Sequence, residues 1–380
     1  MKGNQPKRSE VVERAVDTLR LSPVARRRLL AGTGLFSASM AASALLTGCS
    51  AAEQQEGGSG AGDFPKTPKW RFVFVNHVTT NPFFQPTQYG AADACALLGL
   101  DYQWTGSETS KVSEMVNALR TGISGEADGI AVSVVDEDAF RAPVDQALEA
   151  GIPVVSYNAD GTTEDPGSNR LGYIGQDLFT SGVQLGERMV ELVDSGPIVG
   201  FIATPGQLNI QPRIDGAKQA IQDADKDIEF VDEIATGAKL PEEQAAIDAY
   251  WQGHQDLRGM FAVDAGSTQM LGEVMAKYEL AGKGVVAGGF DLVPETLNAI
   301  DAGDLAFTID QQPYLQGFLP VLMLYFYQLS GGLVVPPETN TGLSFVTKEN
   351  VQPFRKQQTR FDGSSEEQKL VELSGPISHD

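Results

Sequence analysis

Polar and aromatic residues directly follow the short apolar runs of this sequence, at places where a ligand could be held. The run at residues 72–76 is followed by Asn81, Phe83 and Phe84, and the next inner run is followed by Asp136. An exposed ring stacks on the C–H face of a sugar, an amide donates to and accepts from hydroxyl groups, and a carboxylate accepts strongly from them. These residues predict a site for a neutral ligand rich in hydroxyl groups.

The later apolar runs end on the same mixture of side chains. An arginine on the helix after one of them offers five donors in a fixed fork, which suits adjacent hydroxyl groups. A Phe-Asp pair after another run combines stacking with hydrogen bonding. The candidate ligand residues in this part of the chain are Asn158, Arg213, Asp264, Phe290, Asp291 and Gln311.

Each of these residues also has a purely structural interpretation. One of the two adjacent phenylalanines could belong to the core with the other incidental, and Arg213 could be a surface residue paired with Asp215. An aspartate after a strand is also a good helix N-cap. We expect Asp138 to fill that role, which leaves Asp136, nearer the strand end, for the ligand.

Short runs rich in β-branched residues alternate with longer amphipathic segments from residue 70 onward. The runs predict buried strands at residues 72–76, 129–135, 153–157, 198–203, 259–264 and 285–290. Strands that alternate with helices predict an α/β fold of parallel sheets and right-handed βαβ units. The ligand crevice of such sheets lies beyond the carboxyl ends of the strands, where the candidate residues stand.

The length and composition limit the possible functions. A chain of 380 residues is long enough for two domains, and its net charge of −22 disfavours binding to nucleic acid. The sequence contains no nucleophile elbow, phosphate loop, dinucleotide fingerprint or metal-ligand cluster. We therefore expect no enzyme activity, no cofactor and no metal; Cys95 is interpreted as a small core residue, and His77 has no assigned role.

The first 48 residues have the three parts of a secretory signal, with arginines at 26–28, an apolar run and small residues before Cys49. Residues 46–49 resemble the bacterial lipobox, in which the cysteine is acylated and becomes the new N-terminus; a chance cysteine in an uncleaved segment is the alternative. The arginines fit a twin-arginine or a general export signal. Residues 49–65 predict a flexible tether. Together, the signal, the lipobox and the tether predict an extracytoplasmic protein that is lipid-anchored to the membrane.

The strand-end motifs resemble those of the type I periplasmic sugar-binding proteins, the ribose, galactose and inositol group. The resemblance spans about residues 71–351. Its motifs lie at residues 81–84, 136–139, 151–155, 289–291 and 308–311. The family fold has two Rossmann-like lobes with parallel sheets, and the three hinge segments implied for this chain lie near residues 158–160, 310–312 and 331–334.

The same resemblance implies a division of the chain and a position for the ligand. The N-terminal lobe would comprise residues 66–158 and 311–332, and the C-terminal lobe 159–310 and 333–355. By its composition, segment 356–380 is a polar tail that we expect to add little to the core. The candidate residues fall on ligand-contacting positions between the lobes. Asp264 stands where ribose-type proteins often have Asn, and the segment around Asn158 lacks their Asp-Arg pair, which argues for a different sugar or a linear polyol.

For function, the resemblance implies that the lobes close by hinge motion around a monosaccharide or polyol. The closed protein, expected to be a monomer, would then be recognised by the permease subunits of an ABC importer. A sensor that presents the ligand to a chemoreceptor or kinase is the alternative that the residues leave open. A sugar-responsive repressor would need a basic helix-turn-helix where this chain has its export signal and tether.

Overall fold

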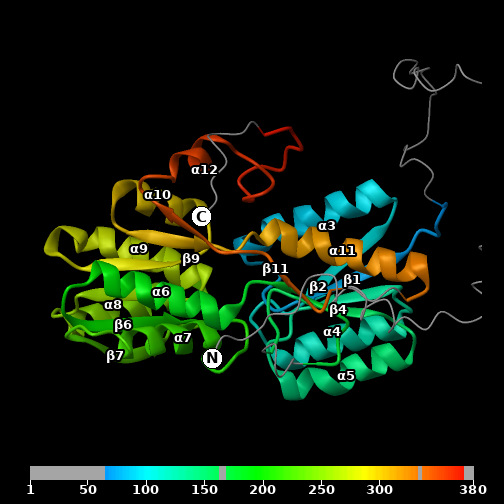
Figure 1. Ribbon diagram of the computed structural model, residues 1–380, viewed down its shortest axis with the longest axis horizontal. Coiled ribbons are helices and arrows are strands. Elements are labelled where there is room, and N and C mark those ends of the chain that lie inside the picture. Colours follow the sequence, from blue (N-terminus) through cyan, green and yellow to red (C-terminus); the bar gives the residue numbers. More distant parts are fainter. Residues whose placement is uncertain (1–64, 162–167, 333–335, 372–380) are drawn as a thin grey trace, which may run out of the picture. The chain divides into compact units, whose positions relative to one another are not determined.

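The computed structural model describes residues 65–161, 168–332 and 336–371. The expected signal segment, Cys49, nearly all of the tether and the last nine residues of the tail lie outside the described residues. From Lys66 onward the chain holds two six-stranded sheets, each covered by helices on both faces (Figure 1). The two-lobed α/β fold predicted from the sequence is confirmed.

The first sheet forms the core of the first lobe. Its order is β11-β5-β4-β3-β1-β2, and all neighbouring strands are parallel. The strands are β1 (Arg71–Asn76), β2 (Asp101–Gly106), β3 (Gly129–Val132), β4 (Val154–Tyr157), β5 (Tyr173–Gly175) and β11 (Glu338–Asn340). One face packs on α3 (Gln85–Leu98) and α11 (Pro313–Ser330), the other on α4 (Val112–Ser124) and α5 (Glu137–Glu149). Burial on both faces explains the apolar runs.

Helices α3 and α11 approach each other closely through two glycines. A Cβ added at Gly90 would lie 2.1 Å from the carbonyl oxygen of Tyr314, and one added at Gly317 would lie 1.9 Å from that of Thr87. Side chains larger than hydrogen are therefore excluded at both positions. The close packing fixes the N-terminal end of α3, next to the predicted site.

The second sheet forms the core of the second lobe. Its order is β12-β10-β9-β8-β6-β7, with β12 antiparallel to β10 and the other pairs parallel. The strands are β6 (Gly196–Ile202), β7 (Ile228–Ala235), β8 (Gly259–Ala262), β9 (Val286–Phe290), β10 (Phe307–Asp310) and β12 (Ser344–Thr347).

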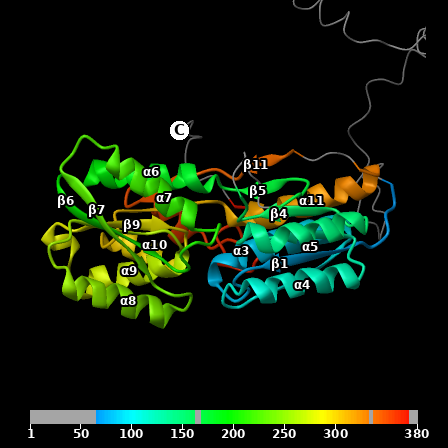
Figure 2. The same ribbon diagram turned by 90° about the horizontal axis from the view of Figure 1, so that it is seen from below.

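The helices of the second lobe divide between the two faces of its sheet. The first face packs on α6 (Leu178–Leu192) and α7 (Gln211–Gln222). The other face packs on α8 (Leu240–Gly253), α9 (Ala265–Lys277) and α10 (Pro294–Ala302), as the turned view shows (Figure 2). A short 3₁₀ turn, η2 (Ala281–Lys283), precedes β9.

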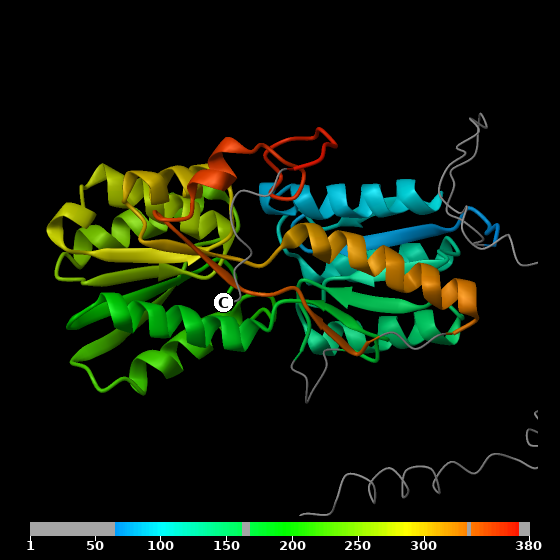
Figure 3. The same cartoon turned by 45° about the horizontal axis from the view of Figure 1, so that its top comes forward.

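The chain passes between the lobes after β5, after β10 and after β11 (Figure 3). These passages are bonded to one another. Gln176 Nε2 donates to the carbonyl oxygen of Gly342 at 3.2 Å, and Thr341 Oγ1 donates to that of Gln311 at 2.7 Å. The three segments therefore form one hydrogen-bonded hinge.

Two lobe boundaries differ from those expected from the sequence. β5 pairs with β4 and β11 pairs with β5, so both strands extend the first sheet. The first lobe thus continues to about Gly175 rather than ending at Asn158, and the third passage follows Asn340 rather than lying at residues 331–334. Both strands have three residues and β11 is polar, which is why no apolar run marks them.

The end of the chain returns to the first lobe, although the sequence suggested a polar tail that adds little to the core. Helix α12 (Gln352–Lys356) packs on α10 of the second lobe. The residues after it, 357–371, are called the C-terminal segment here. In this segment Arg360 forms an ion pair with Asp93 of α3 at 2.9 Å, and Phe361 packs against α11. The chain therefore connects the lobes a fourth time.

Within residues 65–161, 168–332 and 336–371, no helix combines the length and hydropathy needed to cross a bilayer. The strongly apolar α11 covers one face of the first sheet. Its glutamine and proline residues favour this position.

Candidate ligand-binding site

The loop after β1 holds the first predicted site residues. Asn81 caps the 3₁₀ helix η1 (Pro82–Phe84), with its Oδ1 accepting from the backbone N–H of Phe83 at 2.9 Å. Both rings are buried, with Phe84 only 2% exposed, and they pack in one cluster with Ala265 and Val293 of the second lobe. The expectation of an exposed ring is therefore wrong for this arrangement of the lobes; Phe84 packs edge-on against His77 and Phe83 and lies beside Trp104.

Two predicted aspartates cap helices with their side chains. Asp136 Oδ1 accepts from the N–H of Ala139 at 2.9 Å at the start of α5, so Asp136 and not Asp138 is the N-cap. Asp264 caps α9 by accepting from Ser267, and its second oxygen accepts from the N–H of Ala203 at 3.0 Å. Burial raises the pKa of Asp264. Each carboxylate oxygen has a further lone pair, so capping leaves capacity for a ligand.

Arg213 lies in the interior of the protein at 3% exposure. Its Nη1 donates to the carbonyl oxygen of Val263 at 3.0 Å, its Nη2 donates to Gln176 Oε1 at 3.2 Å, and its guanidinium lies 4.1 Å from the ring centre of Phe290. A surface pairing with Asp215 is thereby excluded. Its Nε forms no hydrogen bond with any described residue, which leaves a buried donor available.

A chain of amides links the next predicted residues. Gln311 Nε2 donates to Asp291 Oδ1 at 2.7 Å, Gln316 Nε2 donates to Gln311 Oε1 at 3.2 Å, and Asn158 Nδ2 donates to Gln316 Oε1 at 3.0 Å. Burial raises the pKa of Asp291 to about 7, while Arg213 acts in the opposite direction. Asn158, with φ of 64°, is thus placed in the hinge network, two amides away from Asp291.

Three polar residues at the lobe junction were not among the predicted contacts. His77 bonds through Nδ1 to Ser133 Oγ at 2.9 Å and through Nε2 to Asn209 Nδ2 of the second lobe at 3.2 Å. Burial, aided by Arg213, lowers the pKa of His77 to about 3. Asn209 Oδ1 is buried without a hydrogen-bond partner among the described residues. Asn209 and Gln176 gave no signal in the sequence, because neither directly follows an apolar run.

Further contacts hold the two lobes together around this cluster. Ser110 Oγ donates to Gln207 Oε1 at 2.6 Å, and the N–H of Leu208 donates to the carbonyl oxygen of Val135 at 3.0 Å. The lobes are therefore in direct contact at this junction. The polar groups between them are enclosed rather than open to solvent.

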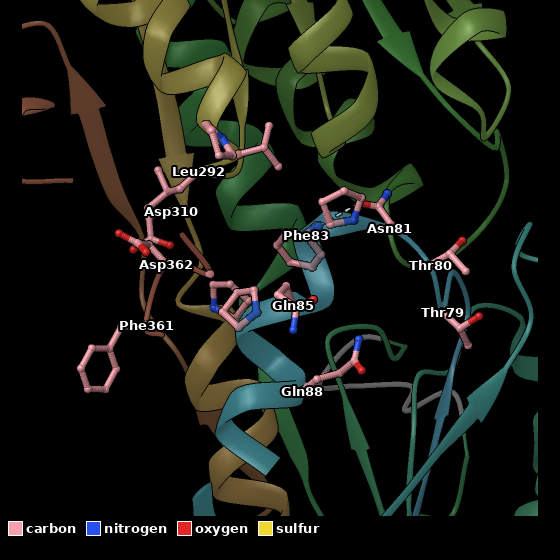
Figure 4. A pocket seen from close by; sticks show the side chains of 16 residues that line it. Thr79, Thr80, Asn81, Phe83, Gln85, Gln88, Leu292, Asp310, Phe361 and Asp362 are labelled. Carbon is pink, nitrogen blue, oxygen red and sulfur yellow. Dashed lines mark hydrogen bonds between the residues drawn. The ribbon is translucent and has the colours of Figure 1, made fainter. Parts of the chain in front are cut away.

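Two pockets flank Asn81 at the edge of the junction. One, of about 480 Å³, is lined by Phe83 and Gln85 of the first lobe, by Asp310, and by Asp362 of the C-terminal segment (Figure 4). The other, of about 280 Å³, is lined by residues that include Asn81 and Glu243. Among the described residues, no group of three His, Cys, Asp or Glu side chains is placed to hold a metal ion.

Comparison with known proteins agrees with this architecture. A family model described as a periplasmic binding protein domain matches residues 72–332. The chain is 51% identical over 315 residues to a xylose/arabinose-binding protein of Sulfolobus acidocaldarius, an alignment that covers 80% of this chain and 77% of that protein. It is 24% identical over 242 residues to the ribose import binding protein of Escherichia coli, which covers 63% of this chain and 79% of the relative.

Solved structures share the fold. A solute-binding protein of an ABC transporter from Burkholderia graminis, solved with D-arabinose, has a TM-score of 0.70 and 25% identity, with 76% of this chain and 99% of that chain covered. A glucose-galactose-binding protein of Geobacillus stearothermophilus has a TM-score of 0.67 and 23% identity, with 75% and 100% covered. The two lobes, the family model and these relatives together show that the chain belongs to the type I periplasmic sugar-binding proteins.

Proposed function

We propose that this protein captures an aldopentose, xylose or arabinose, between its two lobes and delivers it to an ABC importer without chemical change. The observation that carries the proposal is Arg213, a buried cation at the lobe junction whose Nε donor has no partner among the described residues. The choice of pentose is supported by the 51% identical relative, which is named as a xylose/arabinose-binding protein.

In this proposal the ligand hydroxyl groups meet both lobes. Arg213 Nε and Asn209 Oδ1 supply a donor and an acceptor that need partners, and a buried polar atom without one is costly. Asp264 and Asp291 accept from hydroxyl groups at the second lobe. The other proposed contacts are Asn81, Phe83, Phe84, Asp136, Phe290 and Gln311, with Asn158 acting through the hinge.

The proposed binding cycle is closure around the hinge. Bonds from the ligand to both lobes make the closed state more favourable than the open one, and closure removes water from the polar cluster. The direct contacts between Ser110 and Gln207 and between His77 and Asn209 would add to closure. The permease would then recognise the two lobes in their closed arrangement.

Isothermal titration of the purified protein against xylose, arabinose, ribose, galactose and inositol tests the proposal. We expect one ligand per chain, with xylose and arabinose bound most tightly. Each bound sugar should also raise thermal stability, since a ligand at 100 times its Kd adds about 2.7 kcal/mol. Failure to bind any of these compounds would contradict the proposal. Tighter binding of ribose would show that the preferred ligand is ribose and not xylose or arabinose.

The site of action is proposed from the N-terminal sequence. Residues 1–48 would direct export, and acylation of Cys49 would hold the protein at the outer face of the membrane by residues 49–65. Radioactive palmitate should label the wild type in cells and not Cys49→Ala. Equal labelling of the two would reject the anchor while leaving sugar binding untouched.

A further inference from the structure

A pocket of about 280 Å³ lies between the lobes beside the proposed ligand residues. Asn81 of the first lobe lines it, and Ala265 and Gly266, which directly follow Asp264, line it from the second lobe. A water molecule takes up about 30 Å³ of liquid, so a pocket of this size has room for several waters. The pocket is large enough for a substantial part of a sugar.

Glu243 of α8 points its carboxyl group into this part of the protein. The residue is 4% exposed, and its Oε2 forms no hydrogen bond with any described residue. Gly266 provides the space for it, since a Cβ added at Gly266 would lie 2.3 Å from Oε2. The nearby Lys239 is paired instead with Glu242 at 3.7 Å. A buried carboxyl oxygen without a partner destabilises a protein, so it points to a role outside folding.

We propose that Glu243 is a specificity-determining residue of the sugar site. Its carboxyl group forms a hydrogen bond with a hydroxyl group of the ligand, in the pocket that Asn81 and Gly266 also line. The inference rests on the proposed function and adds a contact outside the strand ends. The chemistry matches, because a protonated carboxyl group can both donate and accept a hydrogen bond, as a sugar hydroxyl group can.

The charges around Glu243 favour that protonated form. Burial raises its pKa to about 8, and the carboxylates of Asp264 and Glu242 act in the same direction. A neutral carboxyl group is less costly to enclose than a carboxylate when the lobes close. It can also donate to a ligand oxygen, which Asp264 in its ionised form cannot do.

A structural role and a ligand role for Glu243 predict opposite results. If Glu243 supports the fold, Glu243→Leu lowers the stability of the sugar-free protein and leaves the affinity for sugar unchanged. If Glu243 holds the ligand, Glu243→Leu removes an unpaired buried carboxyl group, so the melting temperature of the sugar-free protein rises by about 2–4 °C. The same change weakens sugar binding by about tenfold or more.

The experiment measures the Kd for xylose and arabinose by titration, and the sugar-free melting temperature, for the wild type, Glu243→Leu and Glu243→Gln. Glu242→Gln is the matched control, because Glu242 is the neighbouring glutamate and its side chain is 57% exposed. Glu243→Gln keeps the shape of the side chain and serves if the leucine variant does not fold. The control should match the wild type in both measurements.

Monodeoxy derivatives of xylose then identify the hydroxyl group. One derivative, which lacks the hydroxyl group that Glu243 binds, should bind the wild type about tenfold more weakly than xylose does. Its affinity for Glu243→Leu should equal its affinity for the wild type. Kd values of both Glu243 variants within twofold of the wild type would overturn the inference while leaving the proposed function intact. A wild type that binds no sugar at all would instead overturn the proposed function, and this inference with it.

Discussion

The two walls of the junction differ in the side chains that they contribute. The first lobe presents the rings of Phe83 and Phe84 together with His77, which burial and Arg213 keep uncharged by lowering its pKa to about 3. The second lobe presents Arg213 and three carboxyl groups, those of Asp264, Asp291 and Glu243. Burial raises the pKa values of the last two to about 7 and about 8. The first wall contributes the aromatic rings and an uncharged histidine, and the second contributes the arginine and most of the buried carboxyl groups.

This difference suggests a division of labour in binding. In the proposed binding cycle, hydrogen bonds to the second lobe need no closure, so the sugar would be held there first, while the lobes are apart. The rings of the first lobe then cover the ligand when the lobes meet, and they add apolar contact at that step. Changes in the second wall should therefore alter affinity most, and changes in the first wall should alter stability and closure.

The largest effect is expected for Arg213→Ala. Removal of the cation leaves Asp264 and Asp291 buried without it, so the free energy of unfolding should fall by about 3–5 kcal/mol. Sugar binding should fall below detection in a titration. Arg213→Lys keeps the charge without the planar fork and should be intermediate. Urea unfolding and titration measure both effects, and near-normal affinity of Arg213→Ala would contradict the proposed role of the second wall.

Phe84→Ala tests the first wall. The ring is 2% exposed and packs against His77, Phe83 and Trp104, so its removal should cost about 3–5 kcal/mol of stability by leaving a cavity. Phe326→Ala is the control, because that ring on α11 is 38% exposed. Urea unfolding compares the two variants. An equal loss for both would contradict the burial of the Phe84 ring.

A smaller effect is expected from pH at the first wall. His77 titrates near pH 6.5 in the unfolded chain and near 3 in the folded protein, so only the unfolded state gains a proton between these values. Stability should decline as the pH falls from 6.5 toward 3, and His77→Gln should remove that part of the decline.

Asp291 and Glu243 contribute in the opposite direction. Their folded-state pKa values are raised above the ordinary carboxyl range of about 4, so the folded protein becomes less stable as the pH rises from there through about 7 for Asp291 and about 8 for Glu243. The difference between wild type and His77→Gln at each pH isolates the histidine. Exposed His254→Gln is the control, and identical pH profiles for wild type and His77→Gln would refute the assignment.

The smallest effect separates two neighbouring aspartates. Asp136 is the N-cap of α5, so Asp136→Ala should cost about 0.5–2 kcal/mol of stability. Asp138 lies in the first turn and is exposed, so Asp138→Ala should stay within about 0.5 kcal/mol. Thermal unfolding of the two variants is the measurement. A larger cost for Asp138→Ala would reverse the assignment of the cap.

Much of the second wall could be predicted from the sequence because it follows strand ends. Asp264, Asp291 and Gln311 come directly after apolar runs, and parallel strands bring their carboxyl ends to one edge. The choice between Asp136 and Asp138 as cap was wrong because it depends on the residue at which α5 begins. A shift of two residues moves a side chain from cap to helix, and periodicity does not fix a boundary so closely.

The rest of the site depends on how separate elements pack. Phe83 and Phe84 are buried in a cluster that joins side chains from several elements of the first lobe with Ala265 and Val293 of the second, and no local sequence pattern reports such packing. His77, Asn209 and Glu243 lie far apart in the sequence and reach the junction only through the folded lobes. The lobe boundaries were misplaced because β5 and β11 have three residues each, too few for a visible run.

The return of the C-terminal segment to the first lobe affects how the hinge motion could be observed. The folded part of the chain begins with β1 in the first lobe, and Arg360 and Phe361 bring its far end back to α3 and α11. Fluorescent proteins fused to the two ends of this folded part would therefore both be attached to the first lobe. The distance between them would hardly change when the lobes close. A sensor for the bound sugar needs one of its two fluorophores inserted in the second lobe, for example at the exposed turn 281–284 before β9.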